Sequence, residues 1–374
     1  MRAAVLNEIR TPLAIEELTI DDPGVGEALV RVVAAGVCHS DLHFIEGTYR
    51  RELPLVLGHE VAGVVEAVGP GVTNVVAGDR VIVGFVQPCG YCDRCQSGRP
   101  NLCETQTTLR SPDEPTLRRG ETPVGVLAQI GGFADYSLTP ASGLVKVPPD
   151  VGLDIAALVG CSVTTGYGAV ANTAKVEPGS TVAVIGAGGV GLNIIHTAAL
   201  VGARRIIAVD LVEEKLDLAK EFGATDCVYA GGGDAVAQVH ALTGGGVDYA
   251  FEAIGLKQTA RQAYDMIRRG GTAVVVGMVP PEDTIEVPGL IWRDEKTLKG
   301  SFYGSARFHV DMPRVLDLYR QGKLDLDRLV TRRFPLEQIN EAFDLLKSSG
   351  VARSVARYQS GTVTARGAWK VRNR

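Results

Sequence analysis

The sequence predicts a mixed α/β protein with a β-rich first domain and a second domain built on a doubly wound parallel sheet. Its 374 residues are enough for two domains of ordinary size. Residues 1–150 contain short runs between Pro/Gly turns, whereas continuous apolar runs alternate with helical patterns after Val159. Hydrophobic residues make up 45% and charged residues 22% of the chain, the balance of a globular protein with an apolar core.

The first domain is expected to consist of short strands. Alternating or apolar runs lie at residues 27–33, 63–68 and 79–83. Turn sequences bound them, such as Asp-Pro-Gly at 22–24 and Gly-Pro-Gly at 69–71. Runs of this length between turns of this kind predict a β-rich domain.

The second domain is predicted from four largely apolar runs, at residues 181–185, 205–209, 249–253 and 272–276. Apolar strands joined by crossover helices form a parallel sheet that is covered on both faces. Residues 311–350 then return to an amphipathic helical pattern. The tail, residues 359–374, carries four basic groups and no acid, and we expect it to be a frayed end.

Composition argues against several classes of partner. The formal net charge of −5 gives no general attraction for nucleic acid or anionic membranes. The N-terminus has no basic segment followed by a long apolar run, and no stretch approaches ~18 uninterrupted apolar residues, so we expect a cytoplasmic protein. In that compartment the seven cysteines are expected to be metal ligands or core thiols in preference to disulfide partners.

A glycine motif predicts a dinucleotide site. Residues 186–191 read Gly-Ala-Gly-Gly-Val-Gly, directly after the strand at 181–185 and at the start of an apolar helix. In such a motif Gly186 permits the tight turn, Gly188 lets the backbone approach the pyrophosphate, and Gly191 lets the helix pack on the strand. The N-terminus of the helix then faces the phosphates.

Asp210 predicts which dinucleotide is bound. It follows the next apolar strand, where a carboxylate accepts hydrogen bonds from the adenosine ribose and repels a 2′-phosphate. NAD is therefore favoured over NADP. The plainer interpretation of Asp210 is a helix N-cap for the segment that starts at Val212.

Four cysteines close together in the sequence predict a structural metal site. They are Cys89, Cys92, Cys95 and Cys103, in a polar, Gly/Pro-rich segment that is unsuited to a core. Cys-x-x-Cys turns aim successive sulfurs at one point, and four thiolates leave no open position on tetrahedral zinc. An iron–sulfur cluster is the alternative with the same ligands.

The remaining candidate ligands, Cys38, His59 and Cys161, are far apart, and their spacing does not unite them. A catalytic zinc needs about three protein ligands and an open position. The plain alternatives are a small buried residue for Cys161 and a turn histidine for His59. Cys227 lies at the edge of a strand and is assigned no role.

Five motifs, in order along residues 1–358, resemble the zinc-containing medium-chain alcohol dehydrogenase family. Besides the four-cysteine lobe and the unit from Gly186 to Asp210, they are Gly-Val-Cys-His-Ser-Asp-Leu-His at 36–43, Gly-His-Glu at 58–60 and Gly-Cys-Ser-Val-Thr-Thr-Gly-Tyr-Gly at 160–168. The resemblance implies a GroES-like catalytic domain with a Rossmann domain inserted in it. Its expected parts are residues 1–160 with the zinc lobe at 87–104, the NAD-binding domain at 161–304, a return at 305–358 and the tail at 359–374.

The resemblance also implies roles for individual residues. Cys38, His59 and Cys161 bind the catalytic zinc, with Glu60 as an occasional fourth ligand, and Asp41 orients the His59 imidazole. The implied contacts to the cofactor come from Lys215 to the adenosine ribose, from His39 and Arg353 to the pyrophosphate, from Gly189 within the glycine turn, and from Thr165 and Val190 to the nicotinamide ring.

The implied reaction is reversible oxidation of an alcohol to an aldehyde by hydride transfer to NAD. Ser40 matches the family's hydroxyl next to the substrate, and His43 matches the histidine that releases the proton to solvent. A surface histidine is the alternative for His43. Phe85 and Tyr49 match substrate-pocket positions and favour a primary or aromatic alcohol, although both are also ordinary packing residues.

Two features limit the resemblance. The glutathione-dependent formaldehyde branch of the family keeps an arginine where this chain has Thr107. Arg110, Arg118 and Arg119 lie in the same loop and could serve another acidic substrate, although solvated charges explain them as well. The length of this loop, residues 104–132, resembles that of dimeric members, so we expect a homodimer.

Two other functions stay open. One is a mycothiol- or artificial-acceptor-linked alcohol or formaldehyde dehydrogenase that holds its NAD tightly, for which activity without added NAD would be evidence. The other is a non-catalytic, zinc-stabilised NAD-binding protein. An open zinc position and a proton path argue against the second, and the zinc ligands argue against the zinc-free quinone reductases of the superfamily.

Overall fold

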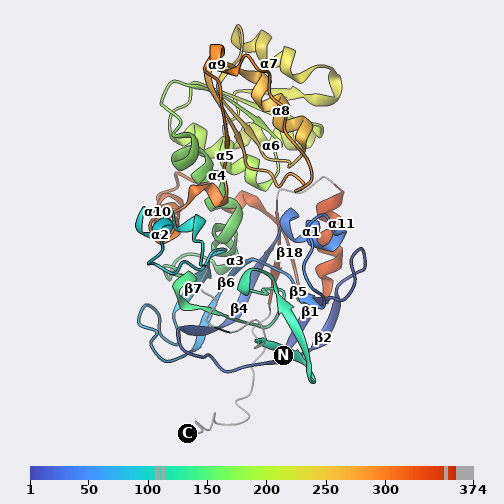
Figure 1. The fold of residues 1–374 in the computed structure, drawn as a ribbon, viewed down its shortest axis with the longest axis vertical. Helices are drawn as coiled ribbons and strands as arrows, with labels where there is room; N and C mark the ends of the chain where they lie inside the picture. Colours follow the sequence, from blue (N-terminus) through green and yellow to red (C-terminus); the bar gives the residue numbers. More distant parts are fainter. Residues whose placement is uncertain (106–109, 111–114, 349–352, 359–374) are drawn as a thin grey trace.

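The computed structural model describes residues 1–105, 110, 115–348 and 353–358, which form three β-sheets with helices around them (Figure 1). Thr107 and the tail at 359–374 lie outside the described residues. The N-terminal half of the chain forms the lower part of Figure 1, and the parallel sheet with α5 to α9 forms the upper part.

Two sheets build the N-terminal part. One has the order β2-β1-β5-β9-β8-β3, and the other has the order β11-β7-β6-β4-β19-β18, with β10 also paired to β4. The strands of the first are β1 (Arg2–Leu6), β2 (Ala14–Glu17), β3 (Thr19–Ile20), β5 (Leu55–Val56), β8 (Leu117–Arg119) and β9 (Thr122–Val126). Those of the second are β4 (Glu27–Val37), β6 (Glu60–Val68), β7 (Arg80–Val83), β10 (Tyr136–Pro140), β11 (Leu144–Lys146), β18 (Val330–Phe334) and β19 (Arg353–Arg357).

The third sheet is parallel, with the order β14-β13-β12-β15-β16-β17. Its strands are β12 (Thr181–Ile185), β13 (Arg205–Asp210), β14 (Asp226–Tyr229), β15 (Val247–Glu252), β16 (Ile267–Val275) and β17 (Thr297–Gly300). Its helices are α5 (Gly189–Leu200), α6 (Glu213–Glu221), α7 (Ala235–Thr243), α8 (Lys257–Met266) and α9 (Ile291–Asp294). Every residue of β12 is buried, as expected for a central strand covered on both faces.

The other helices surround the sheets of the N-terminal part. They are α1 (His39–Glu46), α2 (Asp93–Gln96), α3 (Leu153–Leu158), α4 (Thr164–Gly168), α10 (Phe308–Arg320) and α11 (Ile339–Lys347), with π-helical segments η4 (Val159–Val163) and η5 (Ala169–Ala174) on either side of α4. Single 3₁₀ turns are η1 (Pro100–Leu102), η2 (Leu127–Gln129), η3 (Ala141–Gly143), η6 (Ala230–Gly232), η7 (Tyr303–Ser305), η8 (Asp327–Leu329) and η9 (Leu336–Gln338).

The chain returns to the second sheet of the N-terminal part after the parallel sheet is complete. β19 pairs antiparallel with the end of β4, placing Ser354 opposite Val37, and it pairs parallel with β18. The segments predicted as strands at 27–33, 63–68, 181–185 and 205–209 lie wholly in strands, and those at 79–83, 249–253 and 272–276 do so except for one end residue each. The helix after the glycine motif begins at Gly189.

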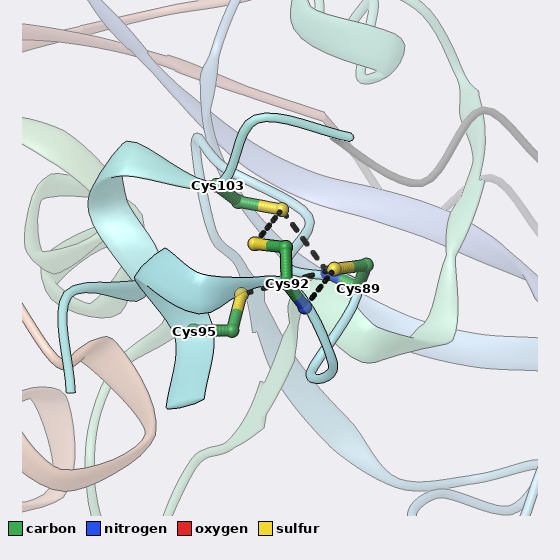
Figure 2. A group of neighbouring side chains, drawn as sticks. All are labelled: Cys89, Cys92, Cys95 and Cys103. Atoms are coloured by element: carbon green, nitrogen blue, oxygen red, sulfur yellow. Dashed lines mark hydrogen bonds between the residues drawn. The ribbon is translucent and has the colours of Figure 1, made fainter. Parts of the chain in front are cut away.

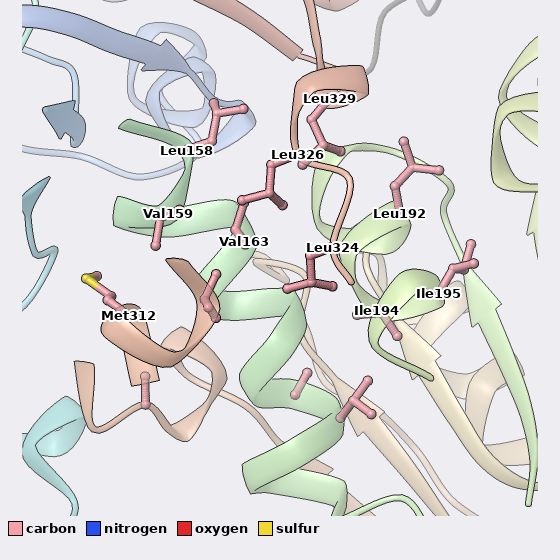
Figure 3. Close-up of a cluster of buried hydrophobic side chains, with 14 of the residues drawn as sticks. Leu158, Val159, Val163, Leu192, Ile194, Ile195, Met312, Leu324, Leu326 and Leu329 are labelled. Atoms are coloured by element: carbon pink, nitrogen blue, oxygen red, sulfur yellow. The ribbon is translucent and has the colours of Figure 1, made fainter. Parts of the chain in front are cut away.

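A shared apolar core fixes the two parts to each other (Figure 3). Leu158 ends α3, Val163 ends η4, Leu192 comes from α5, and Leu326 comes from the connection after α10. Each of these side chains is fully buried. Burial of one such side chain contributes about 1.5–3 kcal/mol, so this cluster holds the glycine turn at a fixed distance from the N-terminal part.

Among the described residues, one helical run is long and apolar enough by composition to cross a membrane. It is Leu153–Ala174, with a mean hydropathy of 1.4. In the fold, 78% of its most apolar window is buried. The run is therefore the central core helix of the molecule, and it passes between the two parts.

Candidate functional site

A cleft of about 540 Å³ collects predicted site residues from both parts of the chain. Its lining includes fifteen residues singled out in the sequence: Cys38, His39, Ser40, His43, Tyr49, His59, Phe85, Cys161, Thr165, Gly186, Gly188, Gly189, Val190, Asp210 and Lys215. The candidate zinc ligands thus share one cavity with the glycine turn.

Three elements bring the candidate catalytic ligands together. Cys38 is the N-cap residue of α1, His59 directly precedes β6, and Cys161 lies in the π-helical segment η4. One ligand atom from each of these residues and from Glu60 can be chosen so that all lie within 4.8 Å of one another. Two sulfurs, an imidazole and a carboxylate form a donor set that fits zinc.

Asp41 holds the imidazole of His59. Asp41 Oδ1 lies 3.1 Å from His59 Nδ1 and accepts a hydrogen bond of 2.9 Å from the backbone N–H of Gly58. Burial alone would lower the pKa of His59, but the Asp41 carboxylate and the Cys38 sulfur raise it well above its usual value. The other ring nitrogen, Nε2, is the atom left to face the donor set.

Glycines make room for this arrangement. Gly36 lies opposite Glu60 across β4 and β6, and a Cβ atom at Gly36 would lie 2.1 Å from Glu60 Oε2. Gly58 has φ +91°, and a Cβ atom there would lie 2.6 Å from the backbone nitrogen of Phe133. Both positions therefore require glycine.

Ser40 and His43 lie on α1 beside the donor set. Ser40 Oγ is 3.6 Å from Cys38 Sγ. The His43 ring packs against the Tyr49 ring with a centroid distance of 5.9 Å, and burial lowers the pKa of His43, although Glu46 and Cys38 act to raise it. A neutral His43 can accept a proton near neutral pH.

The glycine turn has the form of a phosphate cradle. A Cβ atom at Gly191 would lie 1.7 Å from the carbonyl oxygen of Gly186, so helix α5 packs directly on the end of β12. At Gly188, by contrast, no atom lies within 4 Å of where a Cβ would stand. This residue lines the cleft and caps α5, so the open space and the helix N-terminus fit a pyrophosphate.

Asp210 ends β13 and lines the same cleft. Its Oδ2 accepts a hydrogen bond of 2.7 Å from the N–H of Ala187, and its Oδ1 accepts one of 3.1 Å from the N–H of Val212. Asp210 therefore supports the glycine turn and the start of the α6 segment. The bond to Val212 agrees with the prediction that Asp210 supports the start of the next helical segment. The N-cap residue of α6 itself is Val212.

The second donor set is the four-cysteine lobe (Figure 2). The four sulfurs lie within 4.8 Å of one another, with Cys92 Sγ 3.9 Å from Cys103 Sγ and Cys89 Sγ 4.0 Å from Cys95 Sγ. Four sulfurs at 2.3 Å from one tetrahedral zinc ion lie about 3.8 Å apart. The spacing fits a single ion better than a cluster, in which each cysteine binds a different iron.

Local hydrogen bonds favour a thiolate in this lobe. Burial acts to raise the pKa of Cys89, but hydrogen bonds from the Thr105 hydroxyl and from the backbone N–H groups of Tyr91 and Cys92 lower it to about 6. Burial raises the pKa of Cys95 to about 12. These hydrogen bonds favour the thiolate form of Cys89, the form in which a cysteine binds a metal ion.

Aromatic side chains that the sequence analysis missed complete the cleft. Phe302 and Tyr303 follow the last strand of the parallel sheet and line the cavity with Phe85. The Phe85 ring lies 5.3 Å from that of His59, 6.0 Å from that of Phe302 and 5.8 Å from that of Tyr303, in edge-on arrangements. The available signal was an aromatic pair before a glycine at the predicted domain crossover.

Other candidate residues have different partners or stay predictions. Arg110 binds Glu27 and Asp21 at 2.8 and 2.7 Å, so its guanidinium supports the N-terminal part. Arg119 pairs with Glu16 at 2.8 Å. Arg353 begins β19, and its contact with pyrophosphate stays a prediction.

Two family descriptions match the chain. Residues 24–149 match the alcohol dehydrogenase GroES-like domain, and residues 189–321 match the zinc-binding dehydrogenase domain. A relative from Amycolatopsis methanolica, an NDMA-dependent alcohol dehydrogenase, is 40% identical over 363 residues, which are 95% of this chain and 98% of the relative.

Solved structures give the same picture. Benzyl alcohol dehydrogenase from Acinetobacter calcoaceticus is 34% identical with a TM-score of 0.90, over 96% of this chain and 99% of that one. A zinc-binding dehydrogenase from Sinorhizobium meliloti 1021 bound to NADP is 30% identical with a TM-score of 0.78, over 95% and 98%.

Proposed function

Because the chain belongs to the zinc-containing medium-chain alcohol dehydrogenase family, we propose that it oxidises a primary or aromatic alcohol to the aldehyde, reversibly, with NAD as the hydride acceptor and zinc at the reacting oxygen. Its relatives act on alcohols, and it is an oxidoreductase of the zinc type with a GroES-like domain. The cofactor, the number of zinc ions and the roles of individual residues are proposals.

One observation carries this function. Cys38, His59 and Cys161 meet in the wall of the same cleft that contains Gly188 and Asp210. Hydride transfer requires the reacting carbon to lie against the nicotinamide ring, and a cleft shared by metal ligands and a nucleotide cradle supplies that proximity.

The residues of the chain have distinct tasks in this reaction. When bound, zinc would lower the pKa of the alcohol hydroxyl and NAD would accept the hydride. Ser40 Oγ, beside the donor set, would take up the alcohol proton, and the His43 imidazole would pass it to solvent. Thr165 and Val190 would hold the nicotinamide ring, and His39 and Lys215 would bind the phosphate and ribose groups.

The cleft favours an apolar, ring-bearing substrate. Phe85, Phe302 and Tyr303 form an edge-on aromatic wall next to His59. Such a wall offers dispersion and edge-to-face contacts to an aryl group, worth about 0.5–1.5 kcal/mol per ring pair beyond burial. The likeness to a benzyl alcohol dehydrogenase supports the same choice.

Metal analysis combined with one substitution tests the proposal. The purified protein should contain two zinc ions per chain, and Cys161→Ala should lose one of them together with NADH formation from benzyl alcohol, while NAD binding persists. Cys227→Ala is the matched control, because Cys227 lies on β14 and its sulfur contacts the carbonyl of Leu216. Full turnover by Cys161→Ala would contradict the ligand role.

A second candidate function is oxidation with a tightly held cofactor that an artificial acceptor recycles. The 40% identical relative that is NDMA-dependent favours it. In that case the purified enzyme should oxidise alcohol with NDMA and without added NAD, and denaturation should release about one nicotinamide nucleotide per chain. Dependence on added NAD would favour the first function.

Two further proposals concern organisation. We infer that residues 1–160 and 305–358 form the catalytic domain around an NAD-binding domain at 161–304, which the pairing of β19 with β4 supports. A homodimer stays a prediction from the length of the loop at 104–132, and sedimentation would test it.

A further inference from the structure

Tyr303 stands where the chain leaves the parallel sheet and re-enters the N-terminal part. It opens the turn η7, three residues after the end of β17, and is 4% exposed. Its backbone lies in the left-handed region with φ 53°, which a bulky residue adopts only at a cost of about 1–3 kcal/mol. A strained tyrosine beside a ligand set calls for a compensating role.

The hydroxyl of Tyr303 joins two other segments. It donates a hydrogen bond of 2.6 Å to the carbonyl oxygen of Gly160, and it accepts one of 3.2 Å from the backbone N–H of Phe85. Gly160 directly precedes Cys161, and the Phe85 ring packs on His59 at 5.3 Å. One phenol therefore contacts the neighbours of two candidate zinc ligands.

The Gly160 carbonyl belongs to the π-helical segment η4. Carbonyl groups in this segment and just before it also accept hydrogen bonds from side-chain hydroxyls. Ser162 Oγ donates to Leu158 O at 3.4 Å, and Thr164 Oγ1 donates to Val159 O at 2.6 Å. Both of these donors lie within the same helical run. Tyr303 donates to this segment from a different part of the chain, so it can fix the position of η4 relative to the rest of the cleft.

The Tyr303 turn is itself held firmly. The Thr173 hydroxyl lies 2.8 Å from the hydroxyls of Ser301 and Ser305, and Asn172 Nδ2 donates to Gly304 O at 3.3 Å. From the other side, Asn101 in the four-cysteine lobe donates to Phe302 O at 3.0 Å. The phenol thus projects from an anchored base.

We propose that Tyr303 is a positioning residue, which sets the place of Cys161 through Gly160 and the place of His59 through Phe85. The inference rests on the proposed zinc site. Burial raises the pKa of Tyr303 well above its usual value, so the hydroxyl keeps the proton that it donates to the Gly160 carbonyl. The phenol acts on the reaction through the ligands that it holds.

Tyr303→Phe tests the proposal, since it removes the hydroxyl and keeps the ring. Tyr358→Phe is the matched control: Tyr358 is also buried, and its hydroxyl donates to the carbonyl of Gly132 at 2.7 Å, away from the cleft. We expect Tyr303→Phe to lower kcat about 10-fold, in the range for residues that orient metal ligands. Its KM for benzyl alcohol should change much less, because the aromatic wall remains.

The decisive readout is the visible absorption spectrum of enzyme loaded with cobalt(II) in place of zinc, which reports the geometry of thiolate and imidazole ligands. Tyr303→Phe should shift the bands of the cleft site, and Tyr358→Phe should leave them unchanged. An unshifted spectrum and unchanged kcat, with a loss of thermal stability equal to that of the control, would overturn the proposal.

Two further results keep the outcome clear. If Tyr303→Phe does not fold, Phe85→Leu removes the ring on His59 while keeping the backbone N–H, and it must still shift the cobalt bands. An unshifted spectrum then overturns the proposal. If the wild-type protein binds cobalt only in the four-cysteine lobe, the proposed zinc function fails before Tyr303 is tested.

Discussion

Replacing Asp210 with asparagine should move the cofactor preference from NAD toward NADP. Asp210 ends β13 and uses each carboxylate oxygen to accept one backbone N–H, from Ala187 and from Val212. A carboxylate has about four acceptor sites, so acceptors remain for the ribose hydroxyls. Asparagine keeps the size of the side chain, removes its charge and leaves one oxygen that can accept one of the two backbone N–H groups, whereas glycine would remove both backbone contacts and loosen the turn.

The expected magnitude has two parts. Loss of a hydrogen bond to a charged acceptor costs about 1.5 kcal/mol, which weakens NAD roughly 10-fold. Loss of the repulsion between the carboxylate and a 2′-phosphate about 5 Å away strengthens NADP by about 1–3 kcal/mol at an intermediate dielectric. Together these effects should lower the NAD/NADP ratio of kcat/KM by roughly 10²- to 10³-fold.

The assay compares kcat/KM for NAD and NADP with one alcohol at saturation. Asp226→Asn is the control, since it removes the same charge from the same sheet at the start of β14, where Asp226 pairs with Arg205 at 3.1 Å. An Asp210→Asn enzyme whose cofactor ratio stays at the wild-type value would refute the ribose role and leave Asp210 as a support of the glycine turn.

Three other substitutions probe the metal sites and the proton path. Asp41→Asn removes the charged partner of His59 and should weaken zinc binding 10- to 100-fold in chelator competition. The control is Asp311→Asn, which changes another buried carboxylate, on α10, and should retain wild-type zinc affinity. His43→Gln should lower kcat at least about 10-fold near neutral pH. Burial lowers the pKa of His43, and the wild-type oxidation rate should fall as the pH drops through that pKa and the base becomes protonated. This loss of rate at low pH should be absent in the variant. If the variant shows the same loss, His43 is not the base. Cys103→Ala should remove one zinc ion and lower the melting temperature while the cleft zinc remains, and full zinc content would contradict the lobe assignment.

The parts of the fold that could be predicted are those whose signal is local. The central strand β12 is buried along its whole length because helices cover both faces of the sheet, so it was predicted residue for residue. The two-residue strands β3 and β5 carry no periodicity of their own and form only because longer strands pair with them. Helix α5 begins at Gly189 although the glycines at 189 and 191 have low helix propensity, because tertiary packing holds this first turn.

The site divides in the same way. The four-cysteine lobe and the glycine turn each lie within one short segment, so their spacing alone predicted them. Cys38, His59 and Cys161 converge only through tertiary structure, and the residues alone gave no reason to join them. Family resemblance supplied that set, and the geometry is consistent with it.

Once the fold is known, two glycines beside the candidate ligands can be explained. Gly36 makes room for Glu60, and Gly58 lets the chain before His59 pass the backbone of Phe133. A side chain at either position would clash at 2.1 to 2.6 Å, so the donor set depends on missing Cβ atoms as much as on sulfur and nitrogen. For Tyr303 the sequence offered only the aromatic pair before Gly304, because its contacts depend on where the chain crosses between the two parts. Residues that bind through their own motif are therefore accessible from sequence. Asp41 was named because the family resemblance supplied it, whereas Tyr303 emerges only from the folded chain.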